Sequence, residues 1–141
     1  MTATTTSSIS PAREAKPTAR PLWRAGATAG VIASVATLAF AAVARALDVS
    51  LEVGGEAIPL VGFAQVTLVA AIVGTVLAVV LARRTRRPRR TFIATTLSLT
   101  GLSFVPDVLA DAHTATKVTL ALTHIVAAAI VIPALASRLT D

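Results

Sequence analysis

A stripe of polar side chains runs along one apolar segment of the chain. Its members, Thr96, Thr100, Ser103, Asp107 and Asp111, follow one another at spacings of four, three, four and four residues. At about 100° per residue these positions share one face of a helix. A carboxylate such as that of Asp107 within an apolar segment is costly unless it is paired, hydrated or protonated. The stripe is therefore the first place to look for chemistry.

Other polar residues are expected close to the depth of Asp107. If residues 91–111 and 115–137 form antiparallel helices, Thr119 or Leu120 is level with Asp107, Lys117 is slightly nearer the surface, and His124 is about 6 Å deeper. The first apolar segment contributes Arg45 and the second contributes Gln65 at a similar depth. The predicted polar cluster therefore comprises Arg45, Gln65, Asp107, Lys117, Thr119 and His124.

Three interpretations of this cluster are open. Asp107 could form a structural ion pair with Lys117 or Arg45 that joins helices. The cluster could line an outward-facing pocket for a polar or lipidic ligand. It could also carry protons or ions through Asp107 and His124, because histidines in general change charge near neutral pH. The first interpretation is preferred.

Catalysis is the least favoured function. The chain has no His/Glu metal spacing on one helix face, no nucleophile with its base and no glycine-rich phosphate loop, and it contains no cysteine. We assign no catalytic residue, metal ligand or cofactor.

Four long apolar segments must position these residues. The chain is 55% hydrophobic and only 14% charged, with a mean hydropathy of +0.77, which is typical of a membrane protein. Helices are predicted at about 24–47, 60–82, 91–111 and 115–137, each long enough to cross a hydrocarbon core of about 30 Å. The fold class is thus an all-α, four-helix transmembrane bundle over residues 23–139, after a disordered cytoplasmic tail over residues 1–22.

Two of the predicted helices carry a face of small residues. One face consists of Gly26, Gly30, Ser34, Thr37 and Ala41, and the other of Thr67, Ala70, Gly74 and Ala78. Small residues allow helices in a membrane to approach closely. We expect packing within the chain, and a homodimer face is the alternative.

Residues 48–59 differ in character from the apolar segments around them. Val49, Leu51 and Val53 alternate with polar residues and precede a Gly54-Gly55 pair. This pattern predicts a small hairpin outside the membrane, with Leu51 opposite Ile58 and Val53 opposite Glu56.

The distribution of basic residues predicts the orientation. Eleven of the thirteen lysines and arginines lie in the tail, at the start of the first predicted helix, in the loop between the second and third predicted helices, or at the C-terminus. Basic residues favour the cytoplasmic side, so both termini and this loop are predicted inside. The loop arginines would contact anionic lipid headgroups, or alternatively an acidic partner: Arg83, Arg84, Arg86, Arg87, Arg89 and Arg90.

The first apolar segment has a second interpretation. Ala44-Arg45-Ala46 resembles a signal-peptidase site after a basic and an apolar region. The apolar run is longer than in most signal peptides, so a retained helix is preferred.

Several short motifs occur in a familiar order. They are Arg45-Ala46-Leu47-Asp48-Val49, Gly54-Gly55-Glu56-Ala57-Ile58-Pro59, Arg86-Arg87-Pro88-Arg89-Arg90-Thr91-Phe92, Val105-Pro106-Asp107 and Leu122-Thr123-His124-Ile125-Val126-Ala127-Ala128. Over roughly residues 23–139 the chain resembles a family of uncharacterised actinobacterial four-helix membrane proteins, a domain-of-unknown-function family. The resemblance implies the fold and no activity.

The function expected from the sequence is that of a non-enzymatic structural or accessory protein of the envelope, multi-pass in the cytoplasmic membrane. The alternatives are a small transporter or channel, which would have to form a homo-oligomer, or a binder of a lipid or small ligand. The expected partner is the anionic bilayer surface, and nucleic acid is not expected because the basic residues sit at the ends of apolar segments.

Overall fold

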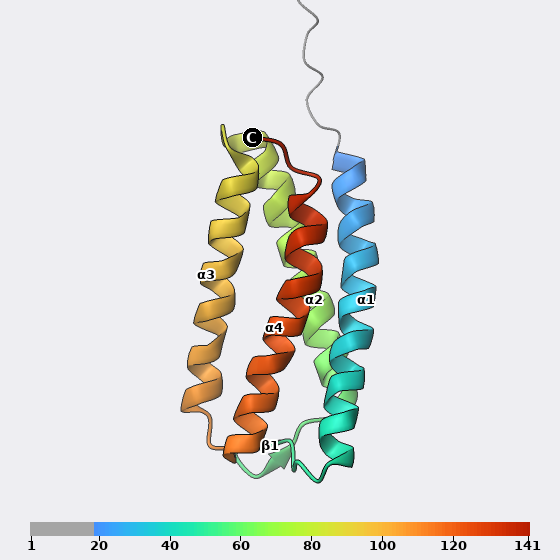
Figure 1. The fold of residues 1–141 in the computed structure, drawn as a ribbon, viewed down its shortest axis with the longest axis vertical. Helices are drawn as coiled ribbons and strands as arrows, with labels where there is room; N and C mark the ends of the chain where they lie inside the picture. Colours follow the sequence, from blue (N-terminus) through green and yellow to red (C-terminus); the bar gives the residue numbers. More distant parts are fainter. Residues whose placement is uncertain (1–18) are drawn as a thin grey trace, which may run out of the picture.

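The structure is a computed structural model that describes residues 19–141. It contains four long helices and one small hairpin, in the order α1 (Ala19–Ala46), β1 (Glu52–Val53), β2 (Glu56–Ala57), α2 (Leu60–Arg84), α3 (Pro88–Leu109) and α4 (Thr114–Ala136). All four helices are long and apolar enough to cross a membrane. The predicted all-α, four-helix class is confirmed. Figure 1 shows the helices running alternately up and down.

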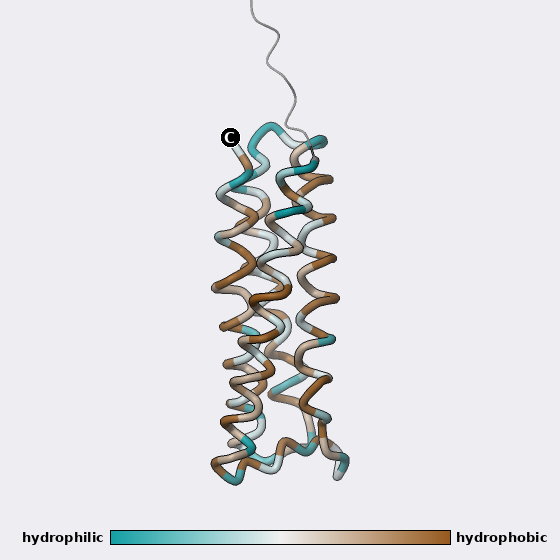
Figure 2. Tube along the Cα trace, turned by 90° about the vertical axis from the view of Figure 1, so that its right-hand side faces the viewer, coloured by the Kyte–Doolittle hydropathy of each residue, from teal (hydrophilic) through white to brown (hydrophobic). Residues whose placement is uncertain are grey.

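The two ends of the bundle differ in content. The start of α1, the turn between α2 and α3 and the C-terminus lie at one end, and the hairpin and the α3–α4 connection lie at the other (Figure 1). Figure 2 shows hydrophilic residues concentrated at these two ends, with mostly hydrophobic residues between them. We call the first the arginine end and the second the hairpin end.

α1 packs closely on α2 through the predicted small-residue face. A Cβ atom on Gly26 would collide with the Thr75 hydroxyl, and one on Gly30 would lie 3.0 Å from the Cβ of Ala71. The expected packing within the chain is thus present. The face of α2 is rotated by about one residue from the prediction, because Thr67, Ala71, Thr75 and Ala78 are buried whereas Ala70 is exposed.

α1 begins at Ala19 rather than near residue 24. Pro21 falls in the first turn, where its missing N–H is tolerated. Leu22 is buried in a cluster with Leu135 and Leu139 at the arginine end, and this contact explains the early start. The tail prediction for residues 1–22 is therefore wrong for residues 19–22, and its remainder lies outside the described residues.

The loop between α2 and α3 is shorter than expected. Arg83 and Arg84 belong to the last turn of α2, and α3 already starts at Pro88, a favoured residue at the first helical position. Asp141 accepts a hydrogen bond from the backbone N–H of Arg90 at 3.2 Å. Asp141 therefore binds a free N–H group in the first turn of α3.

The hairpin has the predicted register. Val53 pairs with Glu56 and Glu52 with Ala57, and the N–H of Ile58 donates to the Leu51 carbonyl at 2.8 Å. Gly54 and Gly55 have φ values of 60° and 80°, as a tight hairpin turn requires. The side chain of Leu51 is buried with Ala41, Ala44 and Phe63, so the hairpin seals this end of the bundle.

Candidate functional site

Asp107 and His124 form the centre of the candidate site. Nε2 of His124 lies 3.3 Å from Oδ2 of Asp107, with 34% and 12% of the two side chains exposed. The atoms are close but not in hydrogen-bond geometry, and Oδ2 accepts no hydrogen bond from the residues that the structure describes. Phe104 meets the imidazole edge-on at 6.3 Å between ring centres. The pair joins α3 to α4 and retains an unused acceptor.

This contact corrects the predicted ion pair of Asp107 with Lys117 or Arg45. Within residues 19–141, His124 is the only basic side chain within 4.0 Å of Asp107. The depth estimate placed His124 about 6 Å deeper than Asp107. It neglected that side chains lean toward the N-terminus of their own helix. In antiparallel helices Asp107 therefore leans toward the arginine end and His124 toward the hairpin end, and they meet.

The other predicted cluster residues form no hydrogen bond or ion pair with Asp107 through their side chains, and three of them have hydrogen-bond partners elsewhere. Lys117 Nζ donates to the Val108 carbonyl at 2.8 Å and so satisfies the last turn of α3. The Thr119 hydroxyl donates to the Ala115 carbonyl, and Arg45 donates to the Ile58 carbonyl beside the hairpin. Gln65 is exposed on α2. The structure therefore brings together Asp107 and His124, with Lys117 near them, but neither Arg45 nor Gln65.

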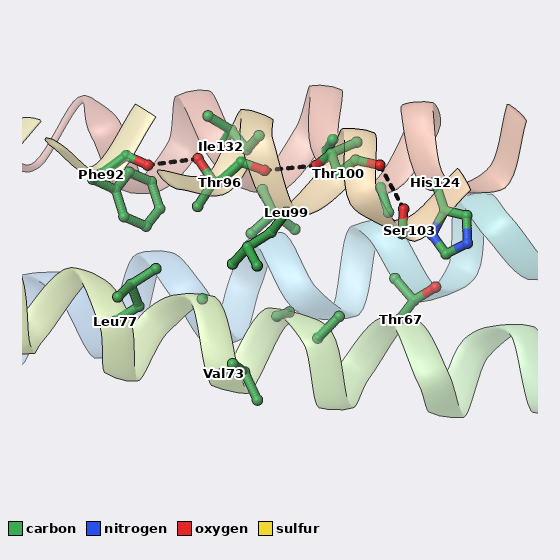
Figure 3. Close-up of a pocket in the computed structure, with 16 residues that line it drawn as sticks. Thr67, Val73, Leu77, Phe92, Thr96, Leu99, Thr100, Ser103, His124 and Ile132 are labelled. Atoms are coloured by element: carbon green, nitrogen blue, oxygen red, sulfur yellow. Dashed lines mark hydrogen bonds between the residues drawn. The ribbon is translucent and has the colours of Figure 1, made fainter. Parts of the chain in front are cut away.

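A groove of about 270 Å³ runs from His124 along α2, α3 and α4. Its α2 wall combines the small residues Ala70, Ala71 and Gly74 with Val73 and Leu77, and α3, on its other side, is the least buried of the four helices. We call it the central groove. In Figure 3 His124 lies at one end near Ser103 and Thr67, and Phe92 and Leu77 lie toward the other.

The hydroxyls of the polar stripe do not reach across the central groove. Thr96, Thr100 and Ser103 donate to the carbonyls of Phe92, Thr96 and Thr100, at 2.7, 2.9 and 2.6 Å (Figure 3). Such bonds to the preceding turn are a common way to satisfy hydroxyls within a helix. The groove is therefore apolar along most of its length and polar at His124.

Ser103, His124 and Asp107 are the residue types of a hydrolase triad. In such a triad the histidine must accept the proton of the serine hydroxyl. Here the Ser103 proton is directed at the Thr100 carbonyl. Acyl transfer is therefore disfavoured in this arrangement. Within residues 19–141 no group of three or more His, Asp or Glu residues is arranged to hold a metal ion.

Sequence reasoning did not find the α2 wall of the central groove. The sequence predicts a helix-packing face at Ala70 and Gly74, whereas both residues line the groove, as do Ala127 and Ala128 of α4. The signal was present as small residues on both α2 and α4, but composition alone does not distinguish a contact between helices from a space between them.

The comparison with protein families agrees with this architecture. The model of a family of unknown function, DUF6069, matches residues 17–141. The chain belongs to this family. Among curated proteins and among solved structures, no match was found. Membership in DUF6069 confirms the resemblance to an uncharacterised family, and an actinobacterial origin stays a prediction.

Proposed function

We propose that this DUF6069 protein is a non-enzymatic, multi-pass protein of the cytoplasmic membrane that binds an amphipathic ligand in its central groove. The observation that carries the proposal is a mostly apolar groove ending at the imidazole of His124, beside a buried carboxylate oxygen with no hydrogen bond among the described residues. A structural or accessory role in the envelope stays a prediction that this proposal would refine.

The orientation proposed for the bundle puts the arginine end in the cytoplasm. Nine of the eleven basic residues expected inside lie within the described chain, at the end that carries the start of α1, the α2–α3 turn and the C-terminus (Figure 1). Arg45 and Lys117 lie at the opposite end. This asymmetry follows the rule that basic residues favour the cytoplasmic side. His124 then lies toward the outer leaflet.

The chemistry of the groove selects the ligand class. Asp107 is an acceptor when ionised, and a neutral imidazole is both donor and acceptor. A ligand with a hydroxyl or amine at one end could donate to His124 or compete for its contact with Asp107. The apolar remainder of the groove, which includes Leu99, Val131 and Ile132, suits a hydrocarbon chain. The expected ligand is therefore a long-chain alcohol or amine, or a lipid that carries such a group.

The test uses the purified full chain in lipid nanodiscs and a long-chain alcohol that carries a photoreactive diazirine. Illumination should label residues of α2, α3 and α4 that line the central groove, and mass spectrometry of the fragments locates the label. An excess of the unlabelled alcohol should protect these residues.

Neighbouring alanines supply a matched pair of variants. Ala128 lines the groove, whereas Ala129 is exposed and does not line it. Ala128→Phe should remove most of the protectable labelling, and Ala129→Phe should leave it unchanged. Labelling that is spread over the outer faces of all helices, or that Ala128→Phe does not reduce, would refute the proposal.

A further inference from the structure

A second groove lies at the arginine end, between the start of α1 and the end of α4. Its volume is about 660 Å³, larger than that of the central groove. Its walls come from residues of α1, from the last two turns of α4 and from the two residues that follow α4. Ile32, one of its lining residues, is 54% exposed, so the groove opens on the flank of the bundle. We call it the flank groove.

Both walls of the flank groove change from charged to apolar in the same direction. On α1, Arg20 and Arg24 lie about one turn apart near the end of the bundle, and Ile32 lines the same groove about two turns further along. On the opposite wall Arg138 follows Ala134 and Ile130 at the same spacing. The arginines are at the end of the bundle, and the isoleucines lie about 12 to 18 Å deeper. The flank groove is therefore cationic at its mouth and apolar below it.

The three arginines at the mouth of the flank groove form no ion pair with a carboxylate of the described residues. No carboxylate of residues 19–141 lies within 4.0 Å of Arg20, Arg24 or Arg138, and Asp141 contacts Arg90 instead. The two hydroxyls in the walls are occupied, because Thr28 donates to the Arg24 carbonyl and Ser137 to the Ala134 carbonyl. The chemistry of this mouth therefore suits an anion with several acceptor oxygens.

We propose that the flank groove binds one anionic phospholipid. Arg20, Arg24 and Arg138 would contact its phosphate, since guanidinium groups match phosphate oxygens with paired donors. One acyl chain would lie against Ala29, Ile32 and Ile130. A basic pocket between membrane helices above an apolar channel fits a lipid headgroup with its chain, whereas a free phosphate would leave the apolar part unused. This site is separate from the central groove and does not depend on the function proposed for it.

Trp23 provides a built-in reporter for this site. It is the only tryptophan of the chain, it is 46% exposed, and it precedes Arg24 without lining the flank groove. Bromine atoms on a lipid chain quench tryptophan fluorescence only near contact. Brominated phosphatidylglycerol as a minor component in phosphatidylcholine vesicles should quench Trp23 of the full chain more than brominated phosphatidylcholine at the same fraction. Added salt should reduce this difference.

Charge-matched variants test the mouth. Arg24→Gln/Arg138→Gln should lower the relative affinity for phosphatidylglycerol by about fivefold for each arginine replaced. Arg86→Gln/Arg89→Gln, the turn variant, removes the same charge from the α2–α3 turn and the start of α3, outside the flank groove. It should weaken the general attraction of the arginine end to headgroups but leave the quenching of Trp23 by brominated phosphatidylglycerol nearly unchanged. Arg24→Lys/Arg138→Lys should retain part of it. An equal loss in the turn variant would mean that only overall charge attracts the lipid, and the proposal would fail.

The apolar part is tested without changing any charge. Ala134→Leu narrows the flank groove, whereas Ala129→Leu adds the same bulk to an exposed position of α4 outside the groove. Only Ala134→Leu should weaken the preference for phosphatidylglycerol. If it does not, or if inorganic phosphate displaces the brominated lipid completely, the arginines bind phosphate alone and the lipid site is excluded. If Arg24→Gln/Arg138→Gln does not fold, two measurements remain to test the lipid site. They are the comparison of Ala134→Leu with Ala129→Leu and the salt titration of the unaltered protein.

Discussion

The hydroxyl oxygens of Thr37 on α1 and Thr67 on α2 lie 3.0 Å apart and share a hydrogen bond. They do so because the residues around them are small enough for the two helices to approach closely. On the arginine side of this bond Gly30 faces Ala71 and Gly26 faces Thr75. Packing and hydrogen bonding between helices are the main attractive forces inside a bilayer, where lipid is as apolar as the side chains. The α1–α2 contact is therefore expected to be the most stable part of the bundle.

The first prediction concerns this contact. Gly26→Ala places a methyl group against the Thr75 hydroxyl and should lower the free energy of unfolding by about 1 to 3 kcal/mol. Gly101→Ala is the matched control, because a Cβ at this position of α3 meets nothing within 4 Å. Thermal unfolding in mild detergent measures both variants. Equal stability of the two variants would mean that α1 and α2 are not in close contact.

The second prediction concerns the pair of Asp107 and His124. In a double-mutant cycle, Asp107→Asn and His124→Gln should show a coupling energy of about 1 kcal/mol, the scale measured for polar contacts between membrane helices. The parallel cycle of Asp107→Asn with Lys117→Met should show almost none, because Lys117 binds the Val108 carbonyl. Denaturant unfolding in detergent gives the free energies. If Asp107 couples more strongly to Lys117 than to His124, its partner is Lys117, as expected from the sequence, and the contact with His124 is unimportant for stability.

The sequence was sufficient for the number of helices, the hairpin register and the small-residue face of α1. These features depend on local patterns: apolar length, the Gly54-Gly55 pair, and spacings of three and four residues. The partner of Asp107 depends instead on the lean of side chains on two helices. The α2 wall of the central groove depends on how far α3 stands from α2. Neither the lean of the side chains nor the separation of α2 and α3 follows from the pattern of a single segment. For this reason the sequence favours Lys117 over His124 as the partner of Asp107, and it predicts that Ala70 packs against another helix.

The third prediction concerns the hairpin turn. Gly54 and Gly55 have positive φ values, and a side chain at either position would meet nothing within 4 Å. Gly54→Ala and Gly55→Ala should therefore act through backbone strain alone, each costing about 1 to 2 kcal/mol. Hydrogen exchange of the Ile58 amide, which bonds to Leu51, should accelerate in both variants. Gly101→Ala serves again as the control, and unchanged exchange in the turn variants would argue against the left-handed turn.

The fourth prediction concerns the orientation proposed for the bundle. Replacing all six arginines between Arg83 and Arg90 by glutamine leaves five of the basic residues expected inside and the two expected outside. The bias toward the proposed orientation is then reduced, so a fraction of molecules should insert in the opposite orientation. Reporter fusions at the C-terminus measure that fraction.

Two further variants determine which residues set the orientation. Adding Arg45→Gln and Lys117→Gln to the six-arginine variant removes the opposing charges and should restore the original orientation. Removing Arg13, Lys16, Arg20 and Arg24 while keeping the six arginines should leave it unchanged. If the six-arginine variant inserts normally and the N-terminal variant does not, the residues before and within the start of α1 set the orientation. The α2–α3 turn would then be free for another role, such as binding an acidic partner, because its arginines are exposed.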